Sequence, residues 1–302
     1  MEETLCLLCN SGKSRKVFEG IDYLHGFSGK FKIVKCSSCG FIYTNPRPNK
    51  KDILNYYPNN YKPHLDSSRR VVTVKNLKKK WYYNGSKDIP NLIPGKILDI
   101  GCSSGSFLFD MKNLGWDVSG IEPSLDSTII ANKSELNVIN ASFEDHIIEK
   151  SLYDYYDLIT AWMVIEHLHN PKQSFEKIYK LLKKDAYFVF SIPEVSSWEF
   201  NFFKDKWYAT QLPTHLSFFT KKTIKKTLEE NNFIVEKIYF HSNLKNLFNT
   251  LIMISDEKKY YNISKILKKL SFKRNSIFMK ILGIFYGFLS QSGRITVWAK
   301  KI

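Results

Sequence analysis

The sequence contains no run of about 20 apolar residues, so no segment is expected to cross a bilayer as a helix. It also lacks the start of a secretory signal, because the first residues, "MEETLCLLCN", are acidic and then bear cysteines. Acidic residues are few, with 29 Asp and Glu against 45 Lys and Arg, and the net charge is +16. We therefore expect a cytoplasmic protein with an anionic partner (nucleic acid, lipid headgroups or a phosphorylated substrate), although a lysine-rich composition alone would also give this charge.

Cysteine is also scarce, and its positions are informative. Four of the five cysteines form two C-x-x-C pairs, Cys6 with Cys9 and Cys36 with Cys39. Disulfides are rare in the cytoplasm, whereas two such pairs can hold one tetrahedral zinc ion through four thiolates. The strand-like segments "VFEG" and "FKIVKC" between the pairs are typical of a zinc ribbon. Because four protein ligands close the coordination sphere, we expect this Zn2+ to be structural rather than catalytic.

From residue 96 onward, strand-like and helix-like segments alternate, which favours a parallel sheet covered by helices on both faces. The predicted strands cover residues 96–100, 117–122, 137–141, 156–162, 186–193, 234–240 and 294–301. The helix after the first strand is expected to end near residue 114, and a short helix is expected after the third strand. Further helices are expected at about 124–135, 171–183 and 220–233, and Thr220 is expected to cap the last of them. About 50 residues separate the last two strands, far more than a hairpin needs.

The turn after the first of these strands, "DIGCSSGS", is at the carboxyl end of a strand, where α/β sheets bind ligands. A dinucleotide fingerprint is absent, because its second and third glycines would fall at Ser103 and Ser106. Glu122 follows at the end of the second strand, where a carboxylate can bind both hydroxyls of a ribose. The turn itself offers an acid and two glycines, Asp99, Gly101 and Gly105. This arrangement favours an adenosine ligand without a pyrophosphate.

Several segments, "ILDIGCSSGSFL", "GIEPS", "YDLITAWMVIEHLHNP" and "HLSFFT", resemble the successive motifs of class I S-adenosylmethionine-dependent methyltransferases. With the run "CSSCGFIYTNPRP", the chain is similar to the members encoded with polysaccharide and sugar biosynthesis. The resemblance implies an α/β, Rossmann-like sheet of seven strands, mostly parallel with an antiparallel last strand. It divides the chain into a zinc ribbon at 1–45, a helical or irregular linker at 46–90 and a methyltransferase domain at 91–302, with a helical insert at about 241–293.

The resemblance also implies which residues bind S-adenosylmethionine. It assigns the methionine end of the cofactor to three residues, Asp99, Gly101 and Gly105. It assigns the ribose hydroxyls to Glu122, adenine to Ser142 and Phe143, and closure over the methionine moiety to Ala161 and Trp162. A core aromatic residue is the alternative interpretation of Trp162. Two places depart from the family pattern, because serine stands at 103 where glycine is usual, and "KDA" at 184–186 replaces a "PGG" turn.

A general base is expected, because an alkyl hydroxyl is a poor nucleophile until its proton leaves. His215 is the first candidate, since it follows the fifth strand and imidazole titrates near neutral pH. The alternative is that His215 pins its loop by hydrogen bonds to the backbone. His167 is the second candidate, in a motif that is often structural. The long aromatic loop at 193–215 is expected to bind sugar rings or to cap the core.

The insert combines basic and apolar segments. Between Lys258 and Lys280 there are eight Lys or Arg residues and no acid, and residues 277–289 are apolar apart from Lys280. A basic helix beside an apolar one is typical of a segment that lies in a membrane interface, so we expect peripheral membrane contact through 258–289, on the inner face of the membrane. A lid over the active site and an oligomer interface are the alternatives.

Three functions fit these patterns. The first is methyl transfer to a sugar hydroxyl in a surface glycan or glycolipid, with a nucleotide- or lipid-linked acceptor. The second is C-methylation of a nucleotide-linked keto-sugar, although the further C-terminal domain usual in such enzymes is missing. The third is nucleic-acid binding or modification, which zinc and positive charge favour. No "NPPY"-like segment follows the fourth strand, so nucleic acid is the least favoured partner.

Overall fold

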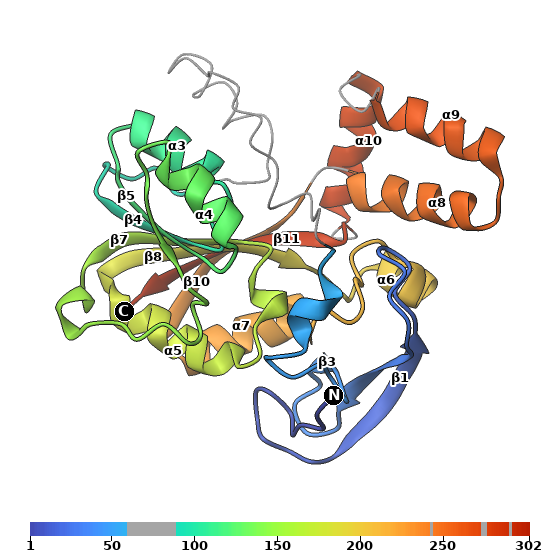
Figure 1. Ribbon diagram of the computed structural model, residues 1–302, viewed down its shortest axis with the longest axis horizontal. Helices are drawn as coiled ribbons and strands as arrows, with labels where there is room; N and C mark the ends of the chain where they lie inside the picture. The colour runs from blue at the N-terminus through green and yellow to red at the C-terminus, as the bar shows by residue number, and fades with distance from the viewer. Residues whose placement is uncertain (59–88, 242–243, 273–276, 290–291) are drawn as a thin grey trace. The chain divides into compact units, whose positions relative to one another are not determined.

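The computed structural model describes residues 1–58, 89–241, 244–272, 277–289 and 292–302 (Figure 1). Most of the linker predicted at 46–90 therefore lies outside the described residues. Its described part contains one short 3-10 helix, η1 at Ile53–Tyr56.

The chain forms two compact units, and each is discontinuous in sequence. The unit that contains the paired cysteines, called the ribbon unit below, consists of Met1–Tyr57, Pro193–Ile224 and Tyr239–Ile295. The other, called the sheet unit, consists of Pro58–Ile192, Lys225–Ile238 and Thr296–Ile302. The segment that carries His215 thus belongs to the same unit as the cysteines.

A seven-stranded sheet has the strand order β10-β11-β8-β7-β4-β5-β6 and confirms the predicted α/β fold. Its strands are β4 Lys96–Ile100, β5 Asp117–Glu122, β6 Asn137–Asn140, β7 Tyr156–Trp162, β8 Leu182–Pro193, β10 Phe233–Phe240 and β11 Arg294–Lys301. The strands from β8 to β6 pair in parallel, whereas the last strands are antiparallel. The apolar runs of the central strands reflect this, because a parallel strand is buried on both faces.

Helices cover both faces of this sheet, with α3 Ser106–Asn113 and α4 Leu125–Asn132 on one face and α5 Pro171–Leu181 on the other (Figure 1). Helix α5 shows why the sequence folds this way. The Asn170 side chain caps its first turn by accepting from the Gln173 backbone, with Pro171 in the first helical position. Its buried face recurs at helical spacing, through Phe175, Ile178 and Leu181.

Helix α7, Lys221–Glu230, begins where the sequence predicts a cap. The Thr223 backbone N–H donates to the Thr220 hydroxyl at 3.1 Å, and the Thr220 N–H donates to the Thr223 hydroxyl at 2.9 Å. The reciprocal pair satisfies two of the donors that a helix leaves open at its start, which confirms the predicted cap.

The cysteine-bearing segment forms a second, antiparallel sheet with the order β1-β2-β3-β9. Its strands are β1 Ser14–Gly20, β2 Phe31–Cys36, β3 Ile42–Thr44 and β9 Ser217–Phe218. Strand β9 pairs with β3 in the register Ile42 opposite Phe218. The ribbon sheet is therefore completed by a strand from the segment that follows β8, a pairing that no pattern in the sequence predicts.

Helices fill the predicted insert between β10 and β11, namely α8 Lys245–Glu257, α9 Tyr261–Phe272 and α10 Ile277–Phe288. The three lie together in the ribbon unit (Figure 1). Of the helices in the described residues, none is both long and apolar enough to cross a membrane.

Two predicted elements differ in detail. Strand β8 begins at Leu182 rather than at 186, because Leu182 already pairs with Tyr156 of β7. The register then shifts so that Tyr187 lies opposite Leu158, and Asp185 between them takes a positive φ of 64°. The short helix expected after the third strand is reduced to a 3-10 turn, η2 at Lys150–Leu152. The carbonyls of Phe143, Glu144 and His146 accept hydrogen bonds from the Lys177 ammonium, which holds the preceding segment as a loop.

Candidate functional site

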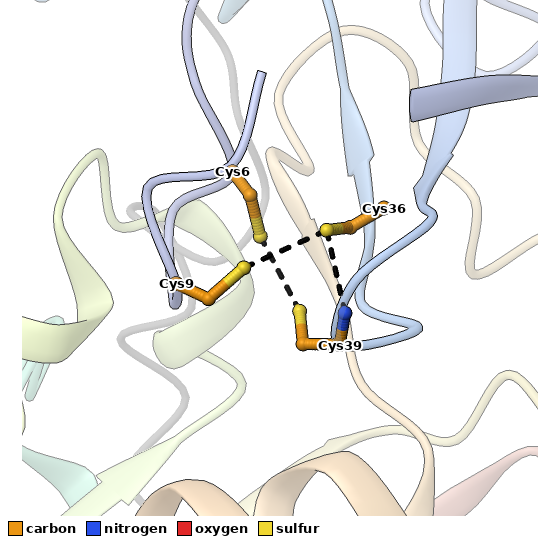
Figure 2. Close-up of side chains that lie close together, drawn as sticks. All are labelled: Cys6, Cys9, Cys36 and Cys39. Carbon is orange, nitrogen blue, oxygen red and sulfur yellow. Dashed lines mark hydrogen bonds between the residues drawn. The ribbon is translucent and has the colours of Figure 1, made fainter. Parts of the chain in front are cut away.

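The four paired cysteines converge on one point in the ribbon unit. Figure 2 shows their side chains turned toward one another from two separate turns. The Sγ atoms of Cys6 and Cys39 lie 3.5 Å apart, those of Cys9 and Cys36 lie 3.6 Å apart, and all four sulfurs lie within 4.8 Å of one another. Thiolates about 2.3 Å from a central zinc ion would be separated by roughly 3.8 Å along each edge of the tetrahedron. The spacing and the donor set therefore fit a structural zinc ion.

The four thiols of this cluster can all ionise only if a cation compensates for their charge. Burial raises the pKa of the Cys6 thiol and raises the pKa of Cys39 to about 11. Burial opposes ionisation of Cys36 as well, yet backbone hydrogen bonds from Cys39 and Ser38 lower its pKa to about 6. Four thiolates so close together would repel one another strongly, and a divalent ion compensates for this charge.

The glycine turn of the sheet unit leaves no room for side chains. Gly101 has a φ of +66°, and a Cβ atom there would lie 2.5 Å from Cγ2 of Val164. Gly105 has a φ of +79°, and a Cβ atom there would lie 2.3 Å from Cδ1 of Leu136. Both positions thus require glycine for backbone conformation and for space. Ser103 also has a positive φ of 51°, so the conformation at this position still favours the glycine that the family usually has.

Glu122 joins the two loops at the carboxyl ends of β4 and β5. Its buried carboxylate accepts the Ser103 N–H at Oε2, at 2.8 Å, and the Ser124 N–H at Oε1, at 2.9 Å. Each carboxylate oxygen has a further lone pair and can accept a second donor. The side chain is therefore held in place by the backbone and retains acceptor capacity for a ligand.

Asp99 is the last residue but one of β4 and is also buried. The Thr160 hydroxyl on the neighbouring strand β7 donates to its Oδ1 at 2.6 Å, because the parallel register places Asp99 beside Thr160. Ala161 follows on the same strand and is fully buried. Trp162 ends the strand and packs edge-on against Phe107 of α3, with ring centroids 5.3 Å apart, which agrees with the core interpretation of this tryptophan.

Ser142 and Phe143 lie in the loop after β6. Lys177 of α5 holds this loop, since its ammonium donates to the Phe143 carbonyl at 2.7 Å and lies 5.0 Å from the centre of the Phe143 ring. The adjacent Glu144 accepts the backbone N–H groups of His169 and Asn170, which ties the loop to the segment after β7.

The two candidate bases belong to different units. His167 ends the 3-10 helix η3, Ile165–His167, in the sheet unit. His215 is buried in the ribbon unit, where the Thr44 hydroxyl of β3 donates to its backbone carbonyl at 2.9 Å and its N–H donates to the Gln211 carbonyl at 3.0 Å. These main-chain bonds hold the segment whichever side chain stands at position 215.

The structure divides the aromatic residues of the 193–215 loop into two groups. Trp207 is fully buried, its Nε1 donates to the Glu199 carboxylate at 2.6 Å, and it packs with Phe200 and Phe218 in the core of the ribbon unit. Trp198 and Phe202 instead lie one turn apart on α6, Trp198–Phe203, where they are 38% and 74% exposed. Trp207 is thus a core residue, whereas Trp198 and Phe202 are accessible to a ligand.

Sequence reasoning missed three residues that position these groups, namely Thr44, Thr160 and Lys177. A signal was present for Thr160, because aligning the apolar centres of β4 and β7 places it beside Asp99. No comparable signal exists for Thr44, whose partner is separated from it by 171 positions.

Comparisons with known proteins agree with this geometry. The family described as "Methyltransferase domain" matches residues 77–238, which is more than half of the chain. The ubiquinone biosynthesis O-methyltransferase of Glaesserella parasuis is 32% identical over 99 residues, which covers 30% of this chain and 42% of that protein. The protein of that name from Cronobacter sakazakii is 26% identical over 102 residues, which covers 32% and 41%. The match thus spans about two fifths of these curated relatives.

Among solved structures, a SAM-dependent methyltransferase from Archaeoglobus fulgidus is similar, with 24% identity and a TM-score of 0.47, over 76% of this chain and 92% of that one. The family match includes the glycine turn, Glu122 and the loops after β6 and β7. The chain therefore belongs to the methyltransferase-domain family, which implies S-adenosylmethionine as its cofactor.

Proposed function

We propose that this methyltransferase transfers the methyl group of S-adenosylmethionine to a hydroxyl oxygen of a sugar, in a surface glycan or glycolipid. The family match supports the methyl-transfer chemistry. The name O-methyltransferase, which belongs to the curated relatives, supports oxygen as the atom that is methylated. C-methylation of a nucleotide-linked keto-sugar is the alternative, and the product distinguishes the two.

The Glu122 carboxylate is the observation that carries the cofactor part of the proposal. It stands at the end of β5, is held by two backbone N–H groups and can accept two more donors. The adjacent hydroxyls of a ribose are such a pair of donors. Gly101 and Gly105 give the turn after β4 a backbone without side chains, and we assign the rest of the cofactor to this turn.

Exposed aromatic rings support a sugar as the acceptor. Trp198 and Phe202 lie on one face of α6, with ring centroids 6.2 Å apart. Aromatic faces of this kind can cover the apolar C–H face of a pyranose, while its hydroxyls stay available for polar groups. We assign these two rings to acceptor binding.

The residues of the chain have two tasks in the reaction. When bound, S-adenosylmethionine supplies a methyl group already activated by a positive sulfur. The chain aligns the acceptor oxygen with that methyl group and removes the hydroxyl proton. We assign proton removal to His215, since an imidazole can act as a base near neutral pH. His167 is the second candidate for this role.

Replacing Glu122 by alanine is expected to weaken S-adenosylmethionine binding by about 2 kcal/mol, or roughly 30-fold, because charge-assisted hydrogen bonds to the ribose are lost. Titration calorimetry measures this directly, and NAD should not bind to the unmodified protein. Asp157→Ala is the control, since Asp157 is also a carboxylate that accepts a backbone N–H, that of Lys96 at 2.8 Å, near the start of β7. Equal affinities for Glu122→Ala and the unmodified protein would remove Glu122 from the cofactor site.

The acceptor is tested by comparing surface glycans from cells with and without the gene. Mass spectrometry should find one sugar residue that is lighter by one methyl group when the gene is absent, and NMR should place the missing methyl on oxygen. A methyl on a ring carbon would support the C-methylation alternative. Glycans that are identical in both strains would contradict a glycan acceptor.

A further inference from the structure

Helix α9 has three distinct faces. Ser264, Leu267 and Ser271 recur at helical spacing on the side that is more buried. Ile263, Ile266 and Leu270 recur at the same spacing on a second side and are between 43% and 59% exposed. The third side carries Asn262, Lys265 and Lys269, all of them exposed. The helix is therefore amphipathic on its solvent side, with an apolar strip directly beside a basic one.

Helix α10 and the residue after it expose a second apolar surface. Its members recur at i, i+3, i+4 and i+8 and are between 49% and 61% exposed, namely Ile281, Ile284, Phe285 and Leu289. Exposed apolar side chains on successive turns are unusual on a monomer and indicate an interaction surface.

The opposite sides of the insert fix it to the core of the ribbon unit. The Tyr286 hydroxyl of α10 donates to the buried Glu199 carboxylate of α6. The Thr250 hydroxyl of α8 accepts the Tyr208 backbone N–H at 2.9 Å. Within the insert, Lys268 of α9 pairs with Asp256 of α8 at 3.0 Å, which ties α9 to the anchored helix α8. The insert thus has an anchored side, and the apolar strips are on the side left over.

The positive charge of the insert indicates which kind of partner its exposed surface can bind. No Asp or Glu occurs between Lys258 and the last residue of the chain. Within the described part of the chain, Lys265 and Lys269 form no ion pair, so their charges are available. A second copy of this segment would bring positive charge against positive charge, which disfavours self-association. A nucleic acid would pair its phosphates with the lysines but would leave the apolar strips of α9 and α10 exposed to water.

We propose that the insert docks the protein on an anionic lipid surface. Isoleucine, leucine and phenylalanine side chains of α9 and α10 enter the boundary of the acyl chains, and Lys265 and Lys269 meet the headgroups. This inference does not depend on the identity of the methyl acceptor, because lipid binding is measured without one.

Vesicle co-sedimentation of the full chain tests the proposal. The protein should bind vesicles made of phosphatidylcholine and phosphatidylglycerol in equal amounts, and it should bind only weakly to vesicles of pure phosphatidylcholine. Binding should weaken as salt increases, because ions screen the headgroup charge over about 8 Å at physiological ionic strength. The double variant Lys265→Gln, Lys269→Gln should bind about 25-fold more weakly, at about 5-fold for each lysine.

A matched control removes the same charge elsewhere. Lys225 and Lys226 are exposed lysines of α7, and their replacement by glutamine should leave vesicle binding within about 2-fold of the unmodified protein, since they are not part of the insert. The variant Ile263→Ser, Ile266→Ser should lose binding while it keeps every lysine. The proposal is overturned if the protein ignores anionic vesicles at low salt. It is also overturned if the unmodified protein is a dimer that the isoleucine variant converts to a monomer. A third contrary result would be that the unmodified protein binds an oligonucleotide but no vesicles, and that the lysine variant no longer binds the oligonucleotide.

Discussion

Replacing Cys36 by serine is expected to abolish zinc binding and to unfold the sheet formed by β1, β2 and β3. The three strands contain 7, 6 and 3 residues and flank the cluster directly, with Cys36 as the last residue of β2. Structural zinc contributes about 10–16 kcal/mol in small zinc modules near neutral pH, which is as large as the whole stability of a typical domain. Elemental analysis should find one zinc ion per chain in the unmodified protein and none in the variant. Hydrogen exchange should show rapid exchange of amides within 14–44 in the variant.

Cys102→Ser is the control for this experiment. Cys102 is buried in the sheet unit and does not belong to the cluster, so the same chemical change should leave the zinc content intact. A chelator should reproduce the effect of Cys36→Ser. A zinc-free protein whose β1 and β2 amides remain protected would show that the cluster is not needed for the ribbon to fold.

Replacing His215 by alanine is expected to lower the rate of methyl transfer by about 100-fold or more, because the acceptor hydroxyl then loses its base. Affinity for S-adenosylmethionine should not change, since the residues assigned to the cofactor are in the sheet unit. The fold should also persist, because the bonds to Thr44 and Gln211 are made by the main chain at position 215. The rate is measured with labelled cofactor and a glycan extract from cells that lack the gene.

His167→Ala is the matched comparison, as the same substitution at the second candidate. If His215 is the base, the His167 variant should keep most of the rate. A His215 variant with a nearly normal rate, together with a slow His167 variant, would assign proton removal to His167. Two fast variants would indicate that water takes the proton.

Much of the sheet was predictable, because its strands are defined by local composition. Strands β4, β5, β7 and β11 have the predicted bounds, because each contains buried β-branched and other apolar residues that the sequence shows directly. The cysteine cluster was predictable for a similar reason. Two C-x-x-C pairs specify the ligand set without any knowledge of the fold between them.

The rest of the site depends on contacts that no local pattern records. The two residues of β9 are too short a segment to be recognised as a strand, and their partner is far away in the sequence. The sequence of the 193–215 loop does not show which of its aromatic side chains are buried. Trp207 can be buried because its Nε1 donates to the Glu199 carboxylate, and this contact is visible only in the structure.

The pairing of β3 with β9 has a consequence for the order of events during synthesis. Strand β3 leaves the ribosome early, but Phe218, which pairs with Ile42, is translated roughly 175 residues later. At typical translation speeds of about 5–20 residues per second, the edge of β3 waits about 9–35 s for its partner. Metal capture by the nascent chain needs only the first 39 residues, so the cysteine cluster can assemble well before the sheet closes. A nascent chain that stops before residue 217 would carry an open strand edge, and such edges promote aggregation.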